Sequence, residues 1–265
     1  MKIIHRISIN GDERQMREFH SAGVDLRVGS STFVIAEHDP RWPDIAELVQ
    51  KHGALDFVST NFSAAERSRS EYLSMDPTWH HGYPQPSDDR SYLQETYDLS
   101  HYCASCGIGK RQVKPFRLKK APSWGKKAIL QLNWVFDEYF VVPDVWEAVF
   151  APFDVGSRPA VLDKTGAVLN SVLQLDIPSS CELALEGRPL EVCADCGREK
   201  YLPISRGFFP APDSSGEPIF KSRQYFGSGG SAFQAVLVSN ALYQKLRDAK
   251  VRGVEFAPCK QQSAN

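Results

Sequence analysis

The sequence lacks a long hydrophobic run, an excess of either charge and a high density of cysteine. No stretch of about 18 apolar residues occurs, which excludes a transmembrane helix. The 31 Lys and Arg residues balance 32 Asp and Glu residues, and the net charge of −1 creates no general attraction to nucleic acid or to a membrane. The N-terminal residues also lack the apolar core of a signal peptide, so we expect a cytoplasmic protein with reduced thiols.

Motifs of the common enzyme classes are missing as well. The seven histidines form neither a His-Glu-x-x-His pattern nor the His-x-Glu pattern of zinc deaminases. Gly107-Ile-Gly109 has no buried strand before it and no third glycine, so it does not match a dinucleotide loop. The glycine-rich segment 227–231 lacks the lysine of a phosphate loop. The sequence therefore predicts a non-enzymatic protein with no catalytic and no cofactor-binding residues.

The first 65 residues alternate between strand-like and helix-like patterns. Strands are expected at 2–9, 24–28, 31–37 and 54–61, and helices at 12–22 and 39–53. The order β-α-β-β-α-β is that of a ferredoxin-like sandwich. We therefore predict an α+β protein with two domains, in which residues 1–65 form a ferredoxin-like unit and residues 66–265 form a mixed α+β domain that contains a zinc ribbon.

Residues 63–100 connect these two parts. The segment is rich in serine and contains Pro77, Pro84 and Pro86, as connections do. It also carries five aromatic side chains, at Tyr72, Trp79, Tyr83, Tyr92 and Tyr97. A flexible tether has little use for so many aromatic residues, so we expect the segment to pack over the domain surface.

Two cysteine motifs carry the chemistry. Cys103-Ala-Ser-Cys106-Gly recurs as Cys193-Ala-Asp-Cys196-Gly, and 86 residues lie between the two pairs. Each Cys-x-x-Cys places two thiolates on one tight turn, and a structural zinc ion takes four such ligands in a tetrahedron. We predict that Cys103, Cys106, Cys193 and Cys196 hold one structural Zn²⁺. Four sulfurs leave no open position for an activated water, so the metal is not expected to be catalytic.

Other interpretations of the cysteines stay open. A redox-active pair would lie where a strand meets a helix, whereas here glycine and charged residues follow each motif. The thiols could also be unliganded. Cys181 and Cys259 have no second cysteine nearby, which is typical of buried apolar positions, and Cys181 could replace a ligand. The repeat of the motif fits either a duplicated unit or coincidence.

A basic stretch follows the first motif. Residues 110–127 contain eight lysines and arginines and no acid, with Phe116 and Trp124 among them. Such a surface suits nucleic acid, which gives an alternative function as a zinc-ribbon protein that binds nucleic acid through Lys110–Lys127. The cations also fit a simpler role, since zinc with four thiolates carries a formal charge of −2 that nearby cations offset. The neutral net charge of the whole chain favours the simpler role.

The two Cys-x-x-Cys-Gly motifs, together with a chain end of the form Leu237-Val-Ser239 … Gly253-Val-Glu-Phe-Ala-Pro258, resemble the bacterial double-CXXCG motif family. The resemblance covers roughly residues 100–260 and leaves out the N-terminal unit. Members of that family are described as immunity proteins that neutralise a cognate toxin. The resemblance thus implies direct binding of a protein toxin, and it carries over no residue beyond the four cysteines.

Overall fold

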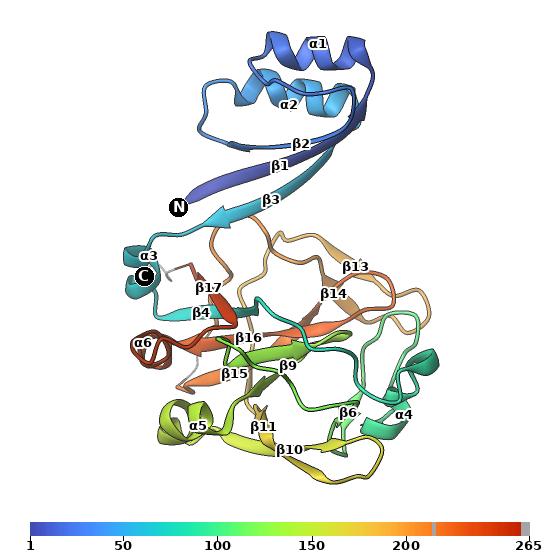
Figure 1. Ribbon diagram of the computed structural model, residues 1–265, viewed down its shortest axis with the longest axis vertical. Helices are drawn as coiled ribbons and strands as arrows, with labels where there is room; N and C mark the ends of the chain where they lie inside the picture. Colours follow the sequence, from blue (N-terminus) through green and yellow to red (C-terminus); the bar gives the residue numbers. More distant parts are fainter. Residues whose placement is uncertain (214–215, 261–265) are drawn as a thin grey trace. The chain divides into compact units, whose positions relative to one another are not determined.

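The computed structural model describes residues 1–213 and 216–260, and it shows an α+β protein in which strands predominate (Figure 1). The chain divides into two compact units. Unit 1 comprises residues 1–66 and 204–208, and unit 2 comprises residues 67–203 and the chain from residue 209 onward. The first division falls one residue from the predicted boundary, whereas nothing in the sequence pattern assigns 204–208 to the first unit. No helix in the described ranges is long and apolar enough to cross a bilayer.

Unit 1 consists of an antiparallel sheet and two helices. The elements are β1 (Lys2–Gly11), α1 (Glu13–Ser21), β2 (Gly29–Ala36), α2 (Trp42–Lys51) and β3 (Leu55–Asn61). Strand β1 lies in the middle of the sheet and pairs with β2 on one edge and β3 on the other. The side chains of Ile7, Phe19 and Ile45 are fully buried in the core between the sheet and the helices. These elements agree with the predicted ones in type and order, with one exception.

The exception is the strand expected at 24–28, which does not form. All of residues 1–66 are described, and they contain three strands rather than the four of the predicted ferredoxin-like order. Gly23 ends α1 with φ +78°, and the Val24 amide donates to the Phe19 carbonyl, as at a helix terminus. Residues 24–28 pair with neither outer edge of the sheet, at β2 or at β3. Val24 is buried in the core of unit 1 without joining a strand ladder.

Unit 2 contains two main sheets in its described part, and helix α3 (Ala64–Arg69) spans the junction with unit 1. The five-stranded sheet has the order β7 (Arg117–Leu118), β10 (Gly156–Leu162), β11 (Val168–Asp176), β9 (Val135–Val141) and β8 (Ile129–Leu132). The larger sheet has the order β13 (Leu190–Val192), β14 (Glu199–Tyr201), β15 (Ile219–Phe226), β16 (Phe233–Ser239), β4 (Tyr72–Pro77) and β17 (Val254–Pro258), and β12 (Ser180–Cys181) also pairs with β15.

Shorter elements complete unit 2. They are α4 (Tyr92–Thr96), α5 (Pro143–Val145), α6 (Asn240–Asp248) and the hairpin of β5 (Tyr97–Asp98) with β6 (Arg111–Gln112). The Ser239 side chain caps the start of helix α6 by accepting from the Leu242 amide at 3.3 Å. Single 3-10 turns occur at Asp88–Arg90 and Ala151–Phe153, and a π turn at Trp146–Phe150.

Two large apolar cores stabilise the described part of unit 2. One joins β4, β15 and β16 of the larger sheet to β8, β9 and β11 of the smaller sheet and to α6. The Tyr139 hydroxyl crosses this core and donates to the Met75 carbonyl. The second core contains Phe116, Leu130 and Phe140, and Tyr92 and Tyr97 of the connecting segment pack into it. The prediction that the aromatic connection packs over the domain is therefore confirmed.

Candidate metal centre

The first cysteine pair lies in the loop that joins β5 to β6. The Cys103 amide donates to the Ile108 carbonyl at 2.9 Å, and the Gly107 amide donates to the Cys103 carbonyl at 2.7 Å. Gly107 has φ +81°, a left-handed conformation that glycine adopts without steric strain. These bonds close a tight turn and place Cys103 and Cys106 next to each other.

The second pair forms the same turn between the antiparallel strands β13 and β14. The Cys193 amide donates to the Arg198 carbonyl at 2.9 Å, and the Gly197 amide donates to the Cys193 carbonyl at 2.8 Å. Gly197 has φ +70°. The repeated Cys-x-x-Cys-Gly sequence thus produces a repeated backbone structure, in which each bond has its counterpart 90 residues along the chain.

The fold brings all four predicted sulfurs together. The Sγ atoms of Cys103 and Cys193 are 3.8 Å apart, those of Cys106 and Cys196 are 3.7 Å apart, and all four lie within 4.8 Å of one another. Four sulfurs at about 2.3 Å from a tetrahedral zinc ion are about 3.8 Å apart, by the geometry of the tetrahedron. The four cysteines therefore form a cluster that suits a metal ion such as zinc.

Several contacts hold the two turns against each other. The Arg198 guanidinium, from the second turn, donates through Nη1 to the carbonyls of His101 at 2.8 Å and Ile108 at 3.0 Å. The Ser105 hydroxyl donates to the Asp195 carboxylate across the centre. The Arg198–Ile108 and Ser105–Asp195 bonds join equivalent positions of the two motifs, so the relative position of the turns is defined by protein contacts as well as by the sulfurs.

A buried lysine, Lys200, stabilises the first cysteine turn. Lys200 follows the second motif on β14 and is 3% exposed. Its ammonium donates to the carbonyls of Cys106 at 3.3 Å, Ser231 at 3.3 Å and Gly229. Glu191 lies 3.9 Å from it. Lys200 thus connects the cysteine turn to the glycine-rich loop between β15 and β16.

That loop, residues 227–231, approaches the first cysteine turn closely. A Cβ atom added to Gly107 would lie 2.6 Å from the Gly230 carbonyl oxygen. A Cβ added to Gly197 would meet nothing within 4 Å. The two motif glycines therefore differ in packing although their backbones are alike.

The surroundings of the sulfurs change their acidity. A hydrogen bond from the Cys106 backbone amide is the main cause that lowers the pKa of Cys103 to about 7. Burial raises the pKa of the Cys106 thiol to about 12. Without a metal ion, Cys103 is thus the more readily ionised of these two, and a cation at the centre is needed to hold the buried sulfur as a thiolate.

The remaining cysteines lie elsewhere in unit 2. Cys181 is on β12 and Cys259 follows β17, and both are buried. The cluster that could hold a metal ion consists of the four motif cysteines, and Cys181 does not take part in it. Burial raises the pKa of Cys259 far above its ordinary value, as expected of an apolar position.

Much of the basic stretch contacts its own protein. Arg111 pairs with Asp98 at 2.7 Å, Lys114 with Glu95 at 4.0 Å, and Arg117 with Asp163 at 2.9 Å. Its aromatic residues are also engaged, since Phe116 is fully buried and the Trp124 indole donates to the Ser171 carbonyl. Lys119, Lys120 and Lys126 are exposed on the surface.

No model of a known protein family matches the chain, and no curated protein or solved structure matches it either. Sequence reasoning found the four cysteines and missed Lys200 and Arg198. Both residues follow the second motif closely, yet a single charged residue after a cysteine pair does not indicate which distant carbonyl it will bind.

Proposed function

We propose that Cys103, Cys106, Cys193 and Cys196 bind one zinc ion whose role is structural and whose two turns form a zinc ribbon. The sulfur separations of 3.7 and 3.8 Å carry this proposal, because they match a tetrahedral thiolate site. Four thiolates fill the tetrahedron and leave no position for substrate or water. The formal charge of −2 on such a site is offset by the ammonium of Lys200, which donates to the Cys106 carbonyl.

We further propose that the protein is a non-enzymatic, cytoplasmic binding protein that neutralises a cognate toxin by direct contact. The paired Cys-x-x-Cys-Gly turns support this role, since they are the motif through which the chain resembles the double-CXXCG immunity proteins. The zinc ion would hold a preformed surface of unit 2 in place, which lowers the ordering cost of binding.

Binding of nucleic acid through Lys110–Lys127 is the weaker alternative. Three of the eight cations are paired with carboxylates of the same chain, and Phe116 is too deeply buried to stack on a base. Affinity for nucleic acid depends on cations that are free to replace counterions at phosphates. The local acids thus leave less of the stretch for that purpose than its sequence suggests.

The toxin proposal is tested by co-expression with the reading frame next to this gene. We expect the neighbouring product to arrest growth, the wild-type protein to restore it, and the Cys106→Ser variant to fail. Cys181→Ala is the matched control, since this buried cysteine lies outside the cluster and the variant should still protect. A toxic neighbour that the wild type neither binds nor neutralises would overturn the proposal.

A further inference from the structure

Unit 2 contains a polar cavity of about 180 Å³. Its walls come from β9 and the pair β15 and β16, from the β5–β6 hairpin, and from β10 and the end of β11. A protein cavity of about 150 Å³ accommodates benzene, so this one has room for a molecule of roughly six to eight non-hydrogen atoms. No residue of the metal centre lines it.

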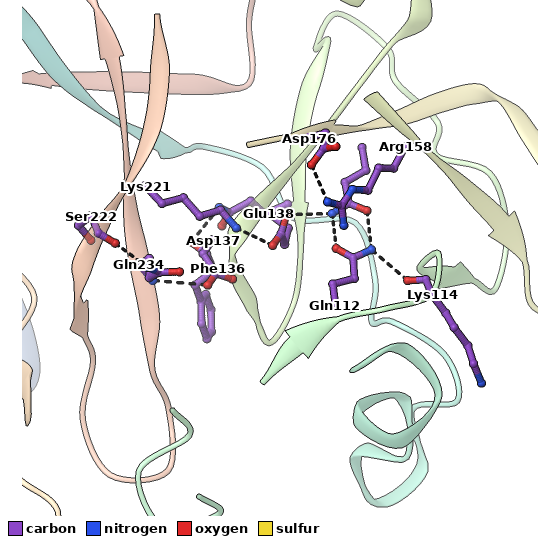
Figure 2. A network of polar contacts seen from close by, with 12 residues as sticks. Gln112, Lys114, Phe136, Asp137, Glu138, Arg158, Asp176, Lys221, Ser222 and Gln234 are labelled. Carbon is purple, nitrogen blue, oxygen red and sulfur yellow. Dashed lines mark hydrogen bonds and ion pairs between the residues drawn. The ribbon is translucent and has the colours of Figure 1, made fainter. Parts of the chain in front are cut away.

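Most of the charged side chains in these walls are paired. The Lys221 ammonium lies 2.6 Å from Glu138 Oε1, and Arg158 lies 2.6 Å from Asp176 Oδ1 (Figure 2). The other oxygen of Glu138 accepts from Gln174 Nε2 at 2.8 Å. These bonds fix the wall side chains in one arrangement, and each of these charges is balanced by an opposite charge in the same wall.

Gln112 extends this arrangement on the hairpin side. Its Nε2 donates to Gln174 Oε1 at 2.9 Å. It also donates to the Lys114 carbonyl at 3.0 Å (Figure 2). The wall is therefore held by contacts among β6, β9, β11 and β15, and it is preorganised before any ligand arrives.

Asp137 is the acidic wall residue that has no ion-pair partner among the described residues. The residue lines the cavity and is only 6% exposed. Its Oδ1 has no hydrogen-bond partner, and its Oδ2 is 3.4 Å from the Gln234 amide nitrogen, a long contact. No cation of the described residues lies within ion-pair distance of it. Burying a carboxylate oxygen without a hydrogen-bond donor is costly, and the described residues supply no donor to Asp137 Oδ1.

The Tyr97 hydroxyl, in the same wall, is buried and also without a partner. Burial, followed by repulsion from Asp137 and Glu138, raises the pKa of Tyr97 well above its ordinary value. The hydroxyl therefore keeps its proton at neutral pH. It adds a second unsatisfied polar group to the cavity.

Lys110 lines the cavity from the hairpin side. Its ammonium lies 5.6 Å from the centre of the Tyr97 ring and forms no ion pair among the residues that the structure describes. The cavity thus carries one unpaired anion and one unpaired cation, Asp137 and Lys110, which are not paired with each other. A ligand that carries a single charge would pair with only one of these two side chains.

We propose that this cavity binds a small free α-amino acid, whose ammonium group donates to Asp137 and whose carboxylate accepts from Lys110. An α-amino acid carries both charges on a few atoms. The cavity volume limits the ligand to roughly six to eight non-hydrogen atoms, the size of alanine, serine, threonine or valine. The site is separate from the metal centre and does not depend on the identity of a protein partner.

The test is calorimetric titration of the zinc-loaded full-length protein with L-alanine, L-serine, L-threonine and L-valine, each at millimolar concentration. Ethylamine and propionate serve as probes that each lack one of the two charged groups of alanine. We expect at least one amino acid to bind, and both single-charge probes to bind about tenfold or more weakly, since a charge-assisted hydrogen bond is lost in each case.

Two variants locate the binding. Asp137→Asn and Lys110→Met should each weaken binding of the amino acid about tenfold or more, while Lys126→Met, a change of an exposed lysine outside the cavity, should leave it unchanged. Circular dichroism and zinc content verify the fold, and Lys110→Met alone decides if Asp137→Asn fails to fold. The proposal is overturned if none of the four amino acids binds, if ethylamine or propionate binds equally well, or if the folded variants bind like the wild type.

Discussion

The change Cys106→Ser tests whether the cysteine cluster is a structural metal site. Cys106 is 3% exposed and its sulfur lies 3.7 Å from that of Cys196. Serine is nearly isosteric but supplies no thiolate, so the fourth ligand is lost. The three remaining thiolates bind the metal more weakly. When the metal dissociates, the link between two turns that are 86 residues apart in the sequence is lost with it.

The magnitude follows from the length of the closed loop. A cross-link around a loop of nearly 90 residues lowers the conformational entropy of the unfolded chain, which stabilises the folded state by about 4–5 kcal/mol. The total stability of a domain is about 5–15 kcal/mol, so this loss is a large part of it. For a domain of the size of unit 2, each kcal/mol shifts Tm by roughly 2–4 °C. We therefore expect the Tm of unit 2 to fall by roughly 10–20 °C.

The assay is differential scanning calorimetry at a fixed free zinc concentration, with metal content measured on the same samples. The wild type should carry about one zinc per chain and should lose a similar amount of stability in a strong chelator. Cys181→Ala is the matched control, a buried cysteine outside the cluster for which a loss of about 1 kcal/mol is ordinary. If Cys106→Ser retains the Tm and metal content of the wild type, or if the control falls equally far, the reasoning is refuted.

Three further predictions concern the neighbourhood of the centre. Gly107→Ala should lower the free energy of unfolding in urea by about 1–3 kcal/mol more than Gly197→Ala does. Both glycines have positive φ, but only a methyl group added at Gly107 meets the Gly230 carbonyl. Equal losses in the two variants would contradict the close packing. In metal-free protein, iodoacetamide should modify Cys103 before Cys106, and the rate at Cys103 should rise as the pH passes its pKa of about 7. Peptide mass spectrometry measures the order of labelling. Earlier labelling of Cys106 would contradict the prediction. Fluorescence anisotropy should detect no appreciable binding of duplex or single-stranded DNA at physiological salt, and Lys119→Ala, Lys120→Ala and Lys126→Ala combined should change nothing; tight, salt-sensitive binding that the triple variant loses would favour the nucleic-acid alternative.

Local sequence determined the cysteine turns and most elements of unit 1. The Cys-x-x-Cys-Gly pattern specifies a tight turn with two adjacent thiols, because spacing and a glycine with positive φ act over a few residues. The helix expected at 12–22 likewise forms, with Asp12 as its capping residue. The strand expected at 24–28 does not form because its pattern is local, whereas in the folded chain the Val24 amide bonds to the end of α1 and the Val24 side chain packs into the core of unit 1.

Only the tertiary structure decided which distant groups meet. It joined the two cysteine turns across 86 residues and placed Lys200 behind the first of them. It neutralised part of the basic stretch with acids such as Asp163 that lie far from it in sequence. It also left Asp137 and Lys110 unpaired in one cavity. Charge and burial depend on neighbours brought together by the sheets, and no spacing along the chain encodes those neighbours.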